Sequence, residues 1–83
     1  MQLGTQFNGT LTANQTINYF TFNWPANWNV SWMMIPTTAG AGAQLQWTVS
    51  TELSGSNITY WIQVKNLTGA TVNFQGRYAV LNA

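Results

Sequence analysis

Residues 45–65 read LQWTVSTELSGSNITYWIQVK and predict a β-hairpin. Apolar and polar residues alternate over 45–53 and again over 58–65, with the period of two of an extended strand that has one side in a core. The intervening residues 54–57, SGSN, are small and polar and favour a tight turn. We therefore expect two antiparallel strands joined by a short turn.

The same alternation continues on both sides of this hairpin. It covers residues 2–11, 16–24, 28–35 and 71–81. Turn or loop sequences separate these runs at 13–15, 25–27, 36–43 and 66–69. About six strands with frequent turns are typical of a small antiparallel sandwich or barrel, and no helical period competes with them. We expect one all-β domain over residues 1–83, with sandwich and barrel both open.

Aromatic residues are expected to supply much of the core. Trp32 and Trp47 lie in the middle of their strands among aliphatic residues, so we expect both to be buried. In the strand over 16–24, the alternation places three aromatic residues on one face, namely Phe20, Phe22 and Trp24. In the first strand, the alternation places on one face Leu3, Thr5, Phe7, Gly9 and Leu11. In the strand over 45–53, the residues that share one face are Leu45, Trp47, Val49, Thr51 and Leu53.

Glu52, Lys65 and Arg77 are the three charged side chains at neutral pH. They amount to 4% of the residues, against about 25% in an ordinary soluble domain. General acid–base catalysis relies most often on a histidine or a pair of carboxyl groups, and the chain has no His and one acidic residue. A Ser or Thr nucleophile has only Lys65 as a candidate base. We therefore expect no enzymatic activity and no catalytic residue, and we expect Glu52 and Lys65 to serve solubility.

The same composition argues against a cofactor, a metal ion and nucleic acid. Without His or Cys there is neither a usual zinc site nor a disulfide, and no phosphate-binding or dinucleotide motif is present. Two cationic residues are too few to neutralise several phosphates. No stretch reaches the roughly 18 apolar residues of a membrane helix. The N-terminus does not have the pattern of a signal peptide, so we expect either a cytoplasmic protein or the mature segment of a secreted one.

Neutral carbohydrate is the ligand class that this composition favours. A sugar presents an apolar C–H face and a ring of hydroxyls, and its complement is an aromatic ring flanked by amides and hydroxyls. The chain has five Trp, ten Asn, seven Gln, four Ser and twelve Thr. Trp61 lies opposite the apolar face of its strand, and residues of the following strand are its expected cross-strand neighbours. The candidate ligand-binding residues are Trp24, Asn27, Trp28 and Asn29 at one turn, Trp61 and Gln63 on one strand, and Gln75 and Arg77 on the next.

These candidates also have purely structural interpretations. Trp24 and Trp28 continue apolar faces, so either the core or a binding site accounts for them. Trp61 is expected either in a ligand site or beneath a neighbouring subunit. For Arg77, the alternative is a solvated or amide-paired side chain.

Self-assembly is the alternative function. Charges of both signs normally protect sheet edges and apolar patches, and this chain has almost none. We expect copies of the chain to form a homo-oligomer under either hypothesis. In a lectin, the repetition of weak sites in an oligomer would provide avidity. In a fibre or matrix subunit, Trp and amide-rich faces would be buried between the copies and hold them together. Insertion of an oligomer into a membrane through aromatic girdles ranks below these two.

The last third of the chain, from ITYWI at 58–62 through GRYAVL at 76–81, resembles the ending of small, largely uncharacterised bacterial β-domains. The stretch FTFNWP at 20–25 is similar to their earlier part, and together these segments cover under half of the chain. The resemblance implies no particular activity, so no site residue is taken from it.

Overall fold

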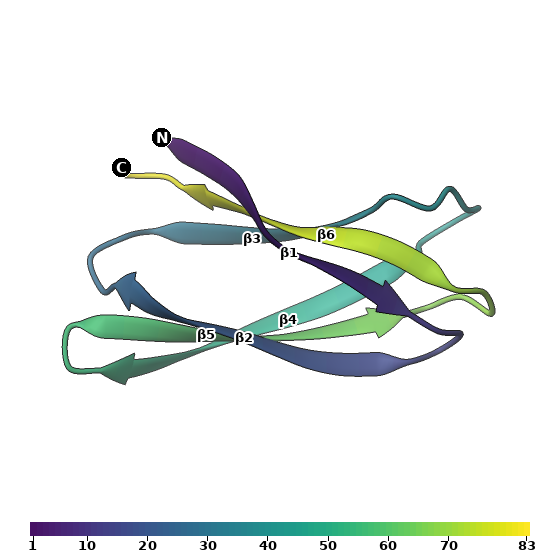
Figure 1. Ribbon diagram of the computed structural model, residues 1–83, viewed down its shortest axis with the longest axis horizontal. Helices are drawn as coiled ribbons and strands as arrows, with labels where there is room; N and C mark the ends of the chain where they lie inside the picture. Colours follow the sequence, from purple (N-terminus) through teal and green to yellow (C-terminus); the bar gives the residue numbers. More distant parts are fainter.

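The computed structural model describes all residues, 1–83, as six strands without a helix (Figure 1). The strands are β1 (Gln2–Leu11), β2 (Thr16–Pro25), β3 (Val30–Pro36), β4 (Leu45–Ser54), β5 (Asn57–Asn66) and β6 (Val72–Val80). They pair antiparallel in two three-stranded sheets, a first sheet ordered β1-β6-β3 and a second sheet ordered β2-β5-β4. The prediction of a small antiparallel all-β domain is confirmed, and the two sheets form a sandwich. No helical segment is present that could cross a membrane.

Most connections of the chain cross from one sheet to the other. Only the hairpin between β4 and β5 joins two neighbours of the same sheet, and its strands match the two runs expected on either side of residues 54–57. The chain leaves the second sheet after β5 and enters the first sheet as β6. Gln2 of β1 pairs with Val80 of β6, so the two ends of the chain lie side by side (Figure 1).

The space between the sheets is filled by nine buried hydrophobic residues. They are Leu11, Trp24, Trp32, Met34, Tyr60, Ile62, Val64, Phe74 and Val80. Burial of a large apolar side chain stabilises a fold by roughly 1.5–3 kcal/mol. Trp24 and Trp32 meet edge to face, with ring centroids 5.4 Å apart and an interplanar angle of 82°. The prediction that Trp32 is buried is confirmed, and Trp47 is half-buried against this core.

A bulge in β2 changes which side chains face the core. The pairing with β5 shifts between Thr21 and Trp24, and Asn23 has a φ of 66°, in the left-handed region. Because of the inserted residue, Thr21 and Trp24 are both buried while Phe22 is exposed. The prediction that Phe20, Phe22 and Trp24 share one face is therefore wrong. The indole Nε1 of Trp24 donates a hydrogen bond of 3.0 Å to Thr21 Oγ1, which satisfies its N–H inside the core.

A second bulge lies in β1, where the pairing with β6 shifts between Thr5 and Phe7. Phe7 packs against the core, whereas Leu3 is 68% exposed. The prediction that Leu3 and Thr5 share the inward face with Phe7 is wrong, because the bulge reverses the alternation. The extra residue, Gln6, donates from Nε2 to Thr21 Oγ1 at 3.2 Å and so links the first sheet to the second.

The edge strand β4 is only partly covered by the opposite sheet. Leu45 and Trp47, in its first half, pack against the core. Val49 and Leu53, in its second half, are 42% and 65% exposed. The apolar face expected for this strand therefore belongs to the core in the first half and faces solvent in the second.

Candidate functional site

Three exposed aromatic rings gather on the outer face of the second sheet. Phe20 and Phe22 come from β2 and are 60% and 59% exposed, and Trp61 comes from β5 and is 45% exposed. We refer to these three residues as the aromatic platform. Monomeric proteins rarely leave large aromatic side chains together in water, so the platform is the candidate binding surface.

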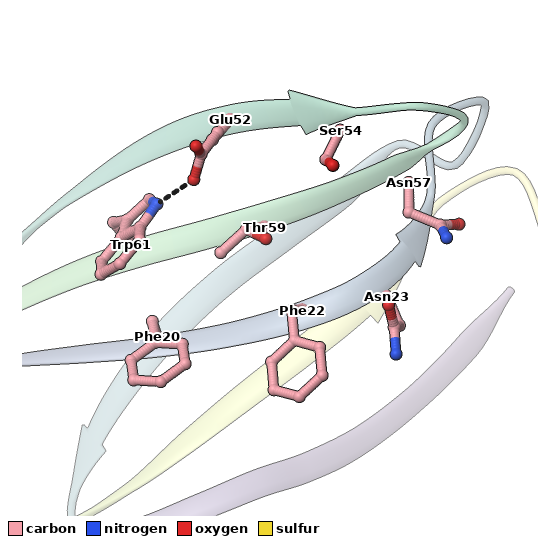
Figure 2. A pocket seen from close by; sticks show the side chains of 8 residues that line it. All are labelled: Phe20, Phe22, Asn23, Glu52, Ser54, Asn57, Thr59 and Trp61. Carbon is pink, nitrogen blue, oxygen red and sulfur yellow. Dashed lines mark hydrogen bonds between the residues drawn. The ribbon is translucent and has the colours of Figure 1, made fainter.

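The platform is built by strand register and by the alternation along β2. Phe20 is the direct partner of Trp61 across β2 and β5, and their ring centroids lie 5.2 Å apart at an interplanar angle of 30°. Phe22 has the same outward direction as Phe20 because the two residues are two apart on the strand, and the extra residue, Asn23, follows them. The centroids of Phe20 and Phe22 are 6.2 Å apart, at 25°. Figure 2 shows these two rings side by side, with Trp61 beyond them on the neighbouring strand.

A shallow hollow of about 360 Å³ adjoins the platform, and we call it the first hollow (Figure 2). Its aromatic side is formed by the platform, and its polar side by residues of β2, β4 and β5. The polar residues are Asn23, Glu52, Ser54, Asn57 and Thr59. The hollow therefore offers ring surfaces together with amide, hydroxyl and carboxylate groups, and it contains no cationic side chain.

The carboxylate of Glu52 holds the indole of Trp61. Trp61 Nε1 donates a hydrogen bond of 3.2 Å to Glu52 Oε1, which the dashed line in Figure 2 marks. Glu52 is the one acidic residue of the chain, and this contact places it at the platform. Oε1 accepts the hydrogen bond from the indole N–H, and the other oxygen has no protein partner and can accept a hydrogen bond from a ligand.

A second hollow of about 330 Å³ lies on the other side of Trp61 on the same sheet. Gln63 of β5 lines it together with its register partners Asn18 of β2 and Thr48 of β4, and Ser50 lies across from Trp61. Trp61 lines both hollows, so the aromatic pair of Phe20 and Trp61 stands between two polar regions. Two of the predicted site residues, Trp61 and Gln63, are thus brought together.

The predicted site residues at the turn after β2 lie elsewhere. Trp24 is 8% exposed and belongs to the core, and Trp28 is half-buried beside it, with ring centroids 6.3 Å apart. Asn27 and Asn29 are exposed, but their backbone groups bind the C-terminal segment. Asn29 N donates to Asn82 Oδ1, and Asn82 Nδ2 donates to Asn27 O, both at 2.8 Å. None of these residues lines the two hollows.

Gln75 and Arg77 are on the outer face of the opposite sheet. Arg77 pairs with Thr5 and Met33 of the first sheet, and its Nε donates to Gln75 Oε1 at 3.0 Å. The prediction that they neighbour Trp61 is wrong, because the chain crosses between the sheets after β5 and β6 pairs with β1 and β3.

Phe20, Phe22 and Glu52 are not among the site residues predicted from the sequence. For Glu52, the register of the hairpin gave a usable indication. A two-residue turn at Gly55-Ser56 fixes the register of the hairpin. In that register Glu52 is opposite Thr59, diagonal to Trp61, within reach of the indole. The exposure of Phe20 and Phe22 had no such signal, because alternation groups them with Trp24, which the bulge turns into the core.

Comparison with known proteins yields no relative. No protein-family model matches the chain, and no curated protein and no solved structure is similar enough to count as a match. The structure also holds no group of three or more His, Cys, Asp or Glu side chains that could bind a metal ion.

Proposed function

We propose that this protein is a non-catalytic carbohydrate-binding domain whose site is the aromatic platform with its two hollows. The observation that carries the proposal is the exposed group of Phe20, Phe22 and Trp61, which has amide, hydroxyl and carboxylate side chains directly beside it. Purely apolar partners would be matched by an apolar rim, and anionic partners by cations. Neutral sugars require this combination of ring faces and neutral hydrogen-bonding groups.

The chemistry of binding follows from the two kinds of side chain. The C–H face of a sugar ring stacks on an aromatic ring, which removes apolar surface of both from water. The hydroxyl groups at the edge of the sugar then meet the side chains of Asn23, Ser54 and Asn57. The Glu52 carboxylate accepts hydrogen bonds from sugar hydroxyls, and charge-assisted hydrogen bonds of this kind are the stronger ones. Because the site is shallow, a single copy binds weakly, and several copies on one oligomer gain avidity.

The proposal is tested with a glycan array and with titration calorimetry on the purified protein, with its mass recorded by light scattering. We expect selective binding that free sugar competes away. Trp61→Ala should abolish this binding, whereas Trp61→Phe, which keeps a ring, should retain part of it. Arg77→Ala, an exposed substitution on the opposite sheet, is the matched control and should bind like the wild type. A folded protein that binds no glycan on the array contradicts the proposal.

Self-association through the edge strand β4 is the second candidate function. The pairing of β4 with β5 is regular along its whole length, whereas the edge strands β1 and β2 carry bulges and β3 ends in Pro36. Irregular edges and charges are the usual protection against pairing with another chain. β4 has neither a bulge nor a proline, its one charged residue is Glu52, and it exposes Val49 and Leu53. A fibre or matrix subunit would use such an edge to pair with copies of itself.

Val49→Lys tests this second candidate. A lysine on the exposed apolar face of the edge strand should convert a large or growing assembly into smaller species, as measured by light scattering. If the mass of the variant equals that of the wild type, β4 is not the assembling edge.

A further inference from the structure

The two hollows follow one another along β5 and share Trp61 as a lining residue, and we call this row of surface the track. The outward side chains of this strand between Asn57 and Gln63 are Thr59 and Trp61, and all four line one or both hollows. With a rise of about 3.3 Å per residue, these side chains extend over about 20 Å. Such a length exceeds a single sugar ring and matches a short segment of a linear chain.

Both ends of the track have polar side chains and its middle is aromatic, although Phe22 and the Glu52 carboxylate line the first hollow only. Amide and hydroxyl groups line each hollow, including Asn57 in the first and Gln63 in the second. Between them lie the register partners Phe20 and Trp61, whose rings are tilted by 30° to each other. A ligand that lies along the track therefore meets polar side chains, then aromatic rings, then polar side chains again.

We infer that the ligand is an unbranched, uncharged glycan that lies along β5 and occupies at least three consecutive sugar positions. One sugar sits in each hollow, and one between them lies against Phe20 and Trp61. This inference rests on the proposed carbohydrate-binding function and specifies its substrate class. Both hollows are shallow and open to solvent, so the chain continues past them, and the site binds an internal segment as well as a free end.

The charges that face the track explain why the glycan is uncharged. Glu52 lines the first hollow and is fixed there by its hydrogen bond to Trp61. A carboxylate or sulfate on a sugar in that position would be repelled by the Glu52 carboxylate. Lys65 lies on the same face of the sheet, two residues beyond Gln63, and lines neither hollow. It therefore offers no compensating contact to an anionic sugar in the first hollow.

The test is a chain-length series measured by titration calorimetry. The probes are β-1,4-linked oligosaccharides of glucose, mannose, xylose and N-acetylglucosamine, each from one to six units, with oligogalacturonate as an anionic series. For the sugar that binds, we expect the affinity to rise at least about tenfold between one and four units and then to level off. The anionic series should bind at least about tenfold more weakly than the uncharged chain of the same length.

Two substitutions at opposite ends of the track separate a lengthwise ligand from a single bound sugar. Asn57→Ala in the first hollow and Gln63→Ala in the second should each lower the affinity for the tetrasaccharide at least about threefold. The matched control is Gln75→Ala, which removes the same side chain from the opposite sheet and should leave the affinity unchanged.

The outcomes distinguish this inference from the function on which it rests. If a monosaccharide binds as tightly as the tetrasaccharide, or if only one of the two hollow substitutions weakens binding, the lengthwise arrangement is overturned and carbohydrate binding stands. If the anionic series binds best, the role given to Glu52 is wrong. If none of the probes binds and the glycan array is also negative, the proposed function itself fails.

Discussion

Phe20 of β2 and Trp61 of β5 are direct register partners whose ring centroids lie 5.2 Å apart on the solvent side of their sheet. A cross-strand aromatic pair stabilises a sheet by a fraction of a kcal/mol to about 1 kcal/mol. Here the pair stays largely exposed, so it leaves ring surface available to a partner. The same pair separates the first hollow from the second, which makes it the centre of the candidate site.

Glu52 is expected to act by orienting Trp61 as well as by binding ligand. Glu52→Ala removes the acceptor of the indole N–H and should lower glycan affinity about threefold to tenfold. Glu52→Gln keeps an acceptor oxygen and should lose less affinity. The indole N–H resonance of Trp61 reports the contact, so it should move in the alanine variant. An alanine variant with full affinity and an unmoved resonance would show that the hydrogen bond has no part in binding.

Asn23 is expected to hold the bulge that turns Trp24 into the core. Its φ of 66° is a conformation that asparagine and glycine adopt more readily than alanine. Asn23→Ala should therefore destabilise the fold by about 1 kcal/mol, whereas Asn23→Gly should change the free energy of unfolding little. Urea denaturation measures both. Equal stability of the alanine and glycine variants would contradict the strain argument.

Deleting Asn23 is a sharper test of the bulge. Without the inserted residue, Phe22 and Trp24 become neighbours on a regular strand, and strict alternation places one in solvent and the other in the core, as the bulge does in the wild type. We therefore expect the deletion variant to fold, with β2 and β5 in a regular ladder and a denaturation midpoint in urea close to that of the wild type. A variant that is unfolded in buffer would show that the bulge contributes more than the direction of Trp24.

Asn66 is expected to be the polar residue on which the fold depends most. Its side chain is completely buried, and Nδ2 lies within hydrogen-bond distance of the carbonyls of Leu11, Thr12 and Ala70, at 3.2, 3.0 and 2.7 Å. Oδ1 accepts from the backbone N–H and the hydroxyl of Thr68. Asn66→Ala leaves several of these groups without a partner and should cost about 3 kcal/mol or more in unfolding free energy.

Two further variants serve as comparisons for the unfolding free energy of Asn66→Ala. Asn66→Asp replaces the donor NH2 with a second oxygen that faces carbonyl groups, so it should destabilise at least as much as alanine. Asn18→Ala, at an exposed amide on β2, is the control and should remain within about 0.5 kcal/mol of the wild type. A small effect at Asn66 would mean that water replaces its contacts.

Stability is expected to fall in alkaline solution because of two tyrosines. Burial raises the pKa of Tyr19 and of Tyr60 above the ordinary value of about 10. The unfolded chain then loses these protons at a lower pH than the folded protein does, so the unfolded state is favoured as the pH rises above about 10. Below that pH both tyrosines stay protonated in the folded and the unfolded state, so their contribution to the free energy of unfolding is fully present. Urea denaturation between pH 8 and 11 measures the loss, and Tyr60→Phe should make the decline less steep. A decline of the same slope in this variant would assign the loss to other groups.

The hairpin of β4 and β5 was predictable because its determinants are local. The alternation over 45–53 and 58–65 specifies two strands, and the small residues at 54–57 specify the turn between them. Gln63 and Trp61 share the outward face for the same reason, since side chains two apart on a regular strand point to the same side. These parts of the site could be read from a pattern of neighbouring residues.

The remaining parts depend on contacts between residues far apart in the sequence. Alternation assigns Trp24 and Phe22 to one face, but in the structure Trp24 is buried against Trp32 and hydrogen-bonded to Thr21. These contacts stabilise the fold more than the irregular pairing at Asn23 destabilises it. The position of Arg77 likewise follows from the strands with which β6 pairs. Alternation with a period of two indicates which side of a strand is apolar, but it does not indicate which sheet the strand joins.

Composition, alternation and turn residues are sufficient to specify a sparsely charged, aromatic, all-β domain of about six antiparallel strands, because each strand and turn is set by its own few residues. The assembly of Phe20, Phe22, Trp61 and Glu52 into one exposed site is a property of the packed sandwich. Strand order and bulges are selected by the burial of side chains from both sheets together, and no single segment of the chain contains that information.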